Sequence, residues 1–120
     1  MIVKRIVANI ATENLGAACA FYGEILGLRL VMDHGWIQTF AGEGLAAPQI
    51  GIATQGGSGT PVPDLSIEVD DVEEVRQRVV ARGLEIEYGP ADEPWGVRRF
   101  FVRDPYGRLV NILSHKDSDG

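Results

Sequence analysis

The sequence of 120 residues has few of the side chains that build disulfides and metal sites. It contains one cysteine, Cys19, and two histidines, His34 and His115. A single cysteine excludes an internal disulfide. No apolar run approaches the ~20 residues of a membrane span, and the apolar part of residues 1–6 is too short for a signal peptide. We therefore expect a cytoplasmic protein, with Cys19 as a small buried side chain.

Basic side chains are also scarce. Lys and Arg number 11 against 17 Asp and Glu, which gives a formal net charge of −6. Nucleic acids and anionic membranes need a basic surface, so neither is an expected partner, whereas a cationic small molecule is permitted. The charge is uneven, because residues 1–60 carry −1 and residues 61–120 carry −5. The acidic residues 68–74 fit a helix cap and a solvated face.

A glycine-rich stretch, Gln55–Pro61, divides the chain into two halves. A length of 120 residues is typical of one domain. The stretch is therefore either a crossover between two half-domains or a surface loop. We expect a first module at about 1–54, a linker at 55–62, a second module at about 63–115 and a polar tail at 116–120.

Hydrophobic spacing predicts the same order of elements twice, namely a strand, a helix and three strands. In the first half we expect strands at 2–11, 28–32, 36–40 and 48–54, with a helix at 15–26. In the second half we expect strands at 65–69, 84–88, 97–103 and 109–113, a helix at 72–82 and a loop at 89–96. Gly27-Leu28 and Gly83-Leu84 end the two helices in the same way.

Three stretches carry a resemblance to the vicinal oxygen chelate superfamily, which includes glyoxalase I, extradiol dioxygenases, and fosfomycin- and bleomycin-resistance proteins. They are the helix end 18–28 with Phe21-Tyr22 and Leu26-Gly27, the strand-to-helix entry 65–72, and the run 94–112. The last contains Pro94-Trp95-Gly96 and Asp104-Pro105-Tyr106-Gly107, and is most similar to the bleomycin-resistance branch.

The resemblance implies an α+β fold in which two βαβββ modules form a cupped mixed sheet. It also implies helices on the outer face, a site on the concave face and a homodimer. Metal-dependent relatives bind their ion through four strand positions. Here these match Val7 (with Asn9 nearby), Gly51, Asp64 and Asn111. Valine and glycine supply no side-chain ligand, and asparagine is a weak one. We therefore expect no metal and no other cofactor.

Aromatic and polar side chains at alternating strand positions point to a ligand site. With the resemblance, they predict a cup walled by rings and supplied with a few polar groups, which suits an aromatic or apolar ligand. The predicted ligand-binding residues are Trp36, Gln38, Phe40, Trp95, Arg99, Phe101, Asn111 and Leu113. The alternative is that the rings fill the core or a dimer interface.

Three functions remain open because this fold hosts all of them. The first, which we favour, is a metal-free protein that binds and sequesters an antibiotic-like small molecule and has no catalytic residues. The second is a glyoxalase-like lyase or isomerase, or a dioxygenase, acting on a small oxygenated substrate. Asp64 is the carboxylate that the resemblance would place in its site. The third is a non-catalytic accessory subunit.

Overall fold

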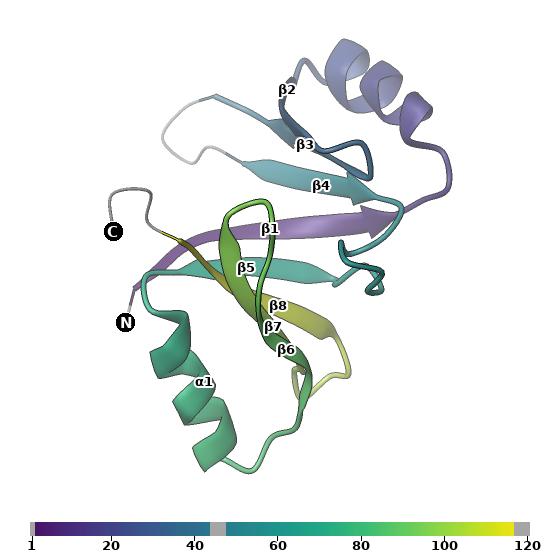
Figure 1. The fold of residues 1–120 in the computed structure, drawn as a ribbon. Helices are drawn as coiled ribbons and strands as arrows, with labels where there is room; N and C mark the ends of the chain where they lie inside the picture. Colours follow the sequence, from purple (N-terminus) through teal and green to yellow (C-terminus); the bar gives the residue numbers. More distant parts are fainter. Residues whose placement is uncertain (1, 44–47, 117–120) are drawn as a thin grey trace. The chain divides into compact units, whose positions relative to one another are not determined.

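The described residues contain the elements in the order predicted from the sequence (Figure 1). The structure is a computed structural model and describes residues 2–43 and 48–116. Hydrogen bonds connect the strands in the order β2-β3-β4-β1-β5-β8-β7-β6. With parallel and antiparallel pairs and few helices, the fold is α+β with a mixed sheet, as expected.

Each half consists of one strand, a helical region and three further strands. The first half comprises β1 (Val3–Ala11), η1 (Leu15–Ala17), η2 (Cys19–Ile25), β2 (Arg29–Asp33), β3 (Ile37–Ala41) and β4 (Gln49–Ala53). The second half comprises β5 (Leu65–Val69), α1 (Val72–Ala81), β6 (Ile86–Asp92), β7 (Val97–Arg103) and β8 (Leu109–His115). Each half pairs its first strand in parallel with its last, so the repeat predicted from the sequence is present in the topology.

Residues 7–62 form one compact unit, the first unit. In it β4 pairs in parallel with β1 and antiparallel with β3, which pairs antiparallel with β2. Its core contains Ala18, Phe40 and Ile52, with η1 and η2 supplying apolar side chains that pack against them. Gly27 has a φ of +75°, a conformation that costs glycine little and that ends the helical region as predicted.

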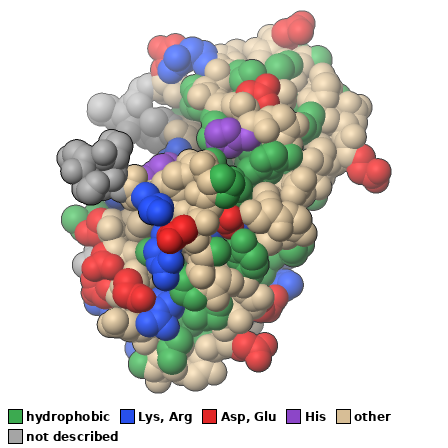
Figure 2. Space-filling model, viewed as in Figure 1, with side chains coloured by type: hydrophobic (Ala, Val, Ile, Leu, Met, Phe, Trp, Pro, Cys, Tyr) green, Lys and Arg blue, Asp and Glu red, His purple; other side chains and the backbone are tan. Residues whose placement is uncertain are grey.

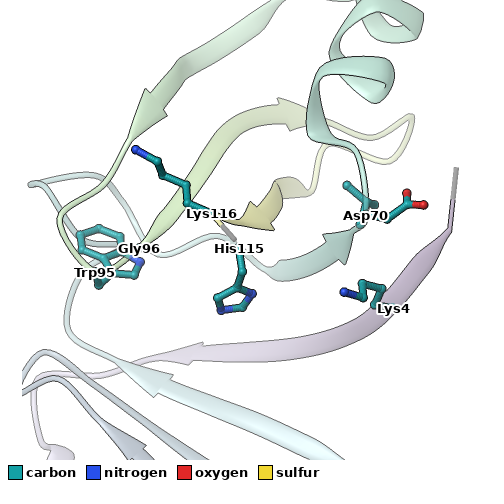
Figure 3. A pocket seen from close by; sticks show the side chains of 7 residues that line it. Lys4, Asp70, Trp95, Gly96, His115 and Lys116 are labelled. Atoms are coloured by element: carbon teal, nitrogen blue, oxygen red, sulfur yellow. The ribbon is translucent and has the colours of Figure 1, made fainter. Parts of the chain in front are cut away.

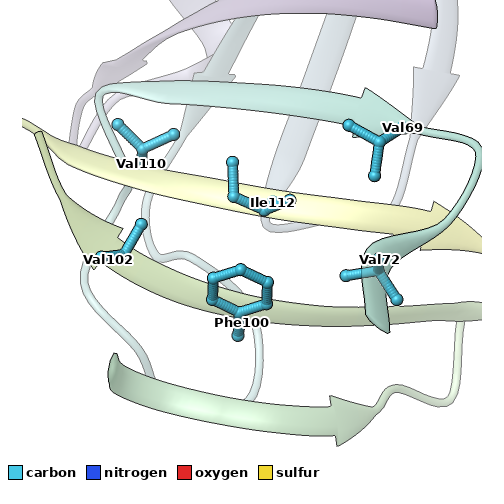
Figure 4. Close-up of a cluster of buried hydrophobic side chains, with 6 residues drawn as sticks. All are labelled: Val69, Val72, Phe100, Val102, Val110 and Ile112. Atoms are coloured by element: carbon cyan, nitrogen blue, oxygen red, sulfur yellow. The ribbon is translucent and has the colours of Figure 1, made fainter. Parts of the chain in front are cut away.

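Residues 1–6 and 63–120 form the second unit. The start of β1 belongs to it because the backbone N–H of Ile2 donates to the Asp70 carboxylate at 2.8 Å, and the Asp70 N–H donates to the Ile2 carbonyl. Its core lies on the face of the sheet that α1 covers, because Val72, Val75 and Val79 of α1 pack into it. Figure 4 shows its buried side chains. The buried members of this core are Val69, Val72, Phe100, Val102, Val110 and Ile112.

The helix α1 begins and ends at the signals seen in the sequence. Asp71 is its N-cap, and the carboxylate accepts the Glu74 backbone N–H at 3.1 Å. Gly83 follows its end with a φ of +76°. Arg78 pairs with Glu74 at 2.6 Å, and Arg76 pairs with Glu73. Acidic and basic side chains accordingly lie next to each other over α1 in Figure 2, so part of the acidic charge of residues 68–74 is neutralised there.

Two predicted segments differ from the structure. The expected helix at 15–26 is a 3-10 turn followed by a π-helix, in which the Leu26 N–H donates to the Phe21 carbonyl five residues back. Cys19 lies in this region and is exposed, not buried.

The expected loop at 89–96 is also wrong over its first part, because β6 continues to Asp92. Irregular register between Ile86 and Ala91 admits Pro90, and pairing resumes with Ala91 opposite Arg99. Proline is tolerated here because β6 is the edge strand of the sheet. None of the described helices is long and apolar enough to cross a membrane.

Candidate functional site

The second face of the second unit's sheet, opposite α1, carries most of the predicted site residues. Successive side chains of a strand point to opposite faces. Phe100 and Ile112 pair in register on the α1 face, so Arg99, Phe101, Asn111 and Leu113 share the other face. In register, Phe101 lies opposite Asn111, and Arg99 lies opposite Leu113. We call these four residues the β7–β8 face.

On the β7–β8 face, the buried Arg99 side chain is surrounded by aromatic rings and one carboxylate. The Arg99 side chain is 3% exposed, and its Nε donates to Glu93 Oε2 at 2.7 Å. Its guanidinium carbon lies 4.9 Å from the ring centre of Trp95, 4.8 Å from that of Phe101 and 5.3 Å from that of Tyr88. We call these five residues the Arg99 cluster. Cation–π contact and the buried ion pair together fix the Trp95 ring on its loop.

Tyr88 completes the arrangement by donating its hydroxyl proton to the same Glu93 oxygen at 2.8 Å. The Glu93 carboxylate is thus bound by a guanidinium and a phenol, and its side chain is 4% exposed. A buried carboxylate is tolerated only with such partners. The predicted residues Trp95, Arg99 and Phe101 therefore come together, and Arg99 is already paired within the protein.

Asn111 has a buried hydrogen-bonding atom that the described residues leave unused. Its Nδ2 donates to the Ser66 hydroxyl at 3.1 Å, while its Oδ1 is buried and has no hydrogen-bond partner among the described residues. Asn111 as a whole is 6% exposed. A buried acceptor without a donor costs roughly 1–3 kcal/mol of folding free energy. Such an atom on a sheet face suits a ligand or a water that brings a donor.

The four strand positions that match metal ligands in relatives do not form a metal site. In the strand register, Asn9 lies opposite Gly51. The residue opposite Asn111 is Ser66 and not Asp64. The Asp64 carboxylate instead accepts the Leu109 backbone N–H at 2.9 Å, which anchors the start of β8.

The space over Gly51 is also taken. A Cβ at that position would lie 2.2 Å from Asn9 Oδ1, so the asparagine side chain covers the glycine. Over residues 2–43 and 48–116, no three His, Cys, Asp or Glu side chains gather closely enough to hold a metal ion. The donor set therefore does not fit the metal that the family uses.

Three predicted residues lie in the first unit. Phe40 is 1% exposed and packs in the core with Ala18 and Ile52, beneath the helical segments. This packing does not agree with the expectation that Phe40 lines the ligand cup. The ring instead fills the core, which was the alternative that the sequence left open. By strand alternation Gln38 shares that side of β3, and its Oε1 is buried without a partner among the described residues. The Trp36 ring stacks on His34 with ring centres 6.0 Å apart.

The second unit also has an open pocket of about 590 Å³ (Figure 3). Trp95 forms one side of it, and both basic side chains and the acidic Asp70 line the rest. The lining residues are Lys4, Val69, Asp70, Trp95, Gly96, His115 and Lys116. We call this the Trp95 pocket.

Sequence reasoning missed several residues of these arrangements. Glu93 and Tyr88 hold Arg99, Ser66 holds Asn111, and Lys4 lies in the Trp95 pocket. One signal was available for Glu93. Arg99 occupies a mid-strand position on a face with Phe101, and a cation placed there needs a buried acid nearby. Glu93, two residues before Trp95, is the acid that the chain offers.

Comparisons with known proteins agree with the fold and with the resemblance. Residues 3–112 match the Glyoxalase/Bleomycin resistance protein/Dioxygenase superfamily. The chain belongs to this superfamily. No protein with a curated description matches the sequence.

Three similar solved structures show the same fold. A chain described as NAD-dependent benzaldehyde dehydrogenase from Legionella pneumophila has a TM-score of 0.74 at 18% identity, covering 93% of this chain and 100% of that one. The hypothetical protein BH1468 from Bacillus halodurans C-125 has a TM-score of 0.73 at 18% identity, covering 98% of both chains. Methylmalonyl-CoA epimerase from Mycobacterium tuberculosis has a TM-score of 0.61 at 19% identity, covering 94% of this chain and 87% of that one. At these identities the likeness concerns the fold alone.

Proposed function

We propose that the chain binds a small aromatic or apolar molecule and releases it chemically unchanged, as antibiotic-sequestering members of the superfamily do. The observation that carries the proposal is the unpartnered, buried Oδ1 of Asn111 beside the Phe101 ring. An apolar ligand with one hydrogen-bond donor would satisfy the amide oxygen and contact the ring. Because Phe101 is 1% exposed and Asn111 is 6% exposed, side chains on this face would have to move to admit it. This combination of apolar walls and a few placed polar atoms is typical of ligand sites.

A lyase, isomerase or dioxygenase is less well supported. In register, Asn9 lies opposite Gly51 and Ser66 lies opposite Asn111, whereas the resemblance matched Val7 and Asp64 to these positions. The side chains of Asn9, Ser66 and Asn111 do not titrate near neutral pH. Asp64, the carboxylate expected in that site, is engaged with the Leu109 backbone. The residues therefore favour binding over acid–base chemistry.

The test is a titration of a panel of aromatic and peptide antibiotics into Trp36→Phe protein, so that Trp95 reports alone by fluorescence. We expect at least one compound to bind saturably at one site per chain, and chromatography to recover it unchanged. The Asn111→Leu variant should bind that compound about tenfold or more weakly, because it lacks the acceptor. A panel without any saturable response, or conversion of the bound compound, would contradict the proposal.

The homodimer implied by the resemblance is also a proposal, and β2 offers a surface for it. All five residues of this strand are exposed, and β2 is an edge strand of the described sheet. Antiparallel pairing of β2 with a second copy would place Arg29 opposite the partner's Asp33 and Val31 opposite the partner's Val31. Exposed apolar edge strands are templates for such pairing, and the charges at the two ends are complementary.

A further inference from the structure

The Trp95 pocket is assembled from segments that are distant in the sequence but lie within the second unit. They are the start of β1, the end of β5, the loop between β6 and β7, and the end of β8. Figure 3 shows the Trp95 ring on one side and Lys4 with Asp70 on the other, with His115 between them. Asn111 does not line this pocket, so the pocket is separate from the acceptor on which the proposed function depends.

The Trp95 ring, which lines one side of the pocket, is held in position by contacts within the protein. Its ring lies over the Arg99 guanidinium at 4.9 Å, and Arg99 is fixed by the buried Glu93 carboxylate. The side chain is only partly buried, so ring surface remains for contact with a ligand. A ring held in this way binds a flat apolar group without an ordering cost of its own.

Most charged groups around the pocket have partners within the second unit. The Asp70 carboxylate accepts the Ile2 N–H at 2.8 Å and keeps its negative charge, because this donor is neutral. His115 Nδ1 lies 2.9 Å from Glu68 Oε2, and Arg5 pairs with the other oxygen of Glu68 at 3.2 Å. Lys116 Nζ lies 3.8 Å from Asp92. These contacts leave one lining cation to consider.

Lys4 is that cation. Its ammonium group makes no ion pair or hydrogen bond with any of the residues that the structure describes. In Figure 3 its Nζ points along the pocket toward the His115 side. The chain as a whole carries −6, so an ammonium without an ion-pair partner, in a pocket that also presents an aromatic ring, is a local exception to its charge.

We infer that the Trp95 pocket binds a small aromatic acid, with the carboxylate on Lys4 and the ring against Trp95. A carboxylate paired with an ammonium forms a charge-assisted hydrogen bond, which is about twice as strong as a neutral one. The ring contributes apolar burial. This inference is independent of the proposed function and concerns a second site. Its ligand is an anion, whereas the acidic composition of the chain permits a cationic small molecule.

The experiment uses three probes that differ only in the charged group: 3-phenylpropanoate, 3-phenylpropan-1-ol and 3-phenylpropylammonium. Each is titrated into Trp36→Phe protein at low salt, with Trp95 fluorescence as the signal. We expect the carboxylate to bind about two- to fivefold more tightly than the other two, because it alone pairs with the ammonium of the exposed Lys4. Added salt should weaken only the carboxylate.

Two variants separate a local effect from a change in overall charge. Lys4→Met should lower the affinity for the carboxylate about two- to fivefold and leave that for the alcohol unchanged. Arg108→Met removes the same charge from an exposed position in the turn before β8 and should have little effect. Equal affinities for the three probes, or equal losses in the two variants, would overturn the inference.

The Asn111→Leu variant distinguishes failure of this inference from failure of the proposed function. It should bind 3-phenylpropanoate as the parent protein does, because Asn111 lies outside the pocket. Loss of the probe in Asn111→Leu protein that melts at the parent temperature would show that the two sites are one, and would overturn the assignment of the acid to the Trp95 pocket.

Discussion

The guanidinium carbon of Arg99 lies 4.9 Å from the centre of the Trp95 ring, and the same side chain is paired with the buried Glu93. This contact links a charge inside the second unit to the loop that borders its pocket. It also explains why an arginine is accommodated on the β7–β8 face, where Phe101 and Leu113 are its neighbours.

Removing either member of the Arg99–Glu93 pair should destabilise the protein strongly. Arg99→Met leaves the buried Glu93 carboxylate without its guanidinium partner, and such losses cost about 3–5 kcal/mol. Chemical denaturation measures the change. The double variant Arg99→Met with Glu93→Leu removes both charges and should recover most of the lost free energy. If the double variant is less stable by the sum of the two single losses, the two side chains do not interact as described.

Replacing Asn111 should separate stability from binding. Asn111→Leu removes a buried acceptor that has no donor among the described residues, and it also removes the Nδ2 hydrogen bond to Ser66. The two effects oppose each other, so the free energy of unfolding should change by no more than about 1 kcal/mol. Ligand affinity should fall in the same variant. Thermal melts with and without the bound panel compound measure both quantities. A loss without ligand well above the roughly 0.5–1.5 kcal/mol of the Ser66 hydrogen bond would show that Oδ1 has a structural role.

Asp70 should make stability depend on pH at the acidic side. The backbone N–H of Ile2 stabilises the carboxylate and holds the pKa of Asp70 below its ordinary value. A pKa lowered by folding adds stability that is present above the unfolded-state pKa and is lost as pH falls through the folded-state pKa. The Asp70→Asn variant should therefore melt below the parent at neutral pH, and the gap should close as the solution is acidified. A gap that is constant from neutral pH to pH 2 would contradict this role.

Gly51 and Asn9 should behave as a coupled pair. A methyl group on residue 51 would lie 2.2 Å from Asn9 Oδ1, so the asparagine must move in Gly51→Ala protein. Crowding of this kind costs about 1–3 kcal/mol. Asn9→Ala in the same chain opens the space and should recover part of the loss, which a double-mutant cycle measures. Additive effects would mean that Asn9 does not cover Gly51.

The proposed dimer has a test of its own on β2. Sedimentation velocity should give about twice the chain mass of 13.0 kDa. Arg29→Asp should weaken association, because it would place two acidic groups together at each end of the paired strands. Arg29→Asp combined with Asp33→Arg exchanges the charges and should restore it. A parent protein that sediments as a monomer at high concentration would contradict the dimer.

The fold was predictable because local signals agree with the tertiary structure. Strand alternation over 65–69 and 97–103 reproduces β5 and β7 to the residue, and Asp71 and Gly83 border α1 as expected. For the candidate site, the sequence indicated which side chains lie together on one face, namely Trp95, Arg99 and Phe101. That they bind a ligand stays a prediction.

The features of the site that the sequence did not predict depend on contacts between residues that are distant in the sequence. Glu93 was assigned to a loop, and only the tertiary structure brings its carboxylate to Arg99. Phe40 was placed in the cup because alternation identifies a shared face and does not tell which face the helical segments cover. Lys4 and His115 stand 111 positions apart, and nothing in the local sequence indicates that they border one pocket.

The most direct test of the binding function is one calorimetric titration of the tightest-binding panel compound into parent and Asn111→Leu protein, followed by recovery of the compound. We expect one equivalent bound per chain, an affinity about tenfold or more lower in the variant, and the compound recovered intact. Equal affinities in the two proteins would remove Asn111 from the site. A chemically altered compound would show that the chain is an enzyme and not a binding protein.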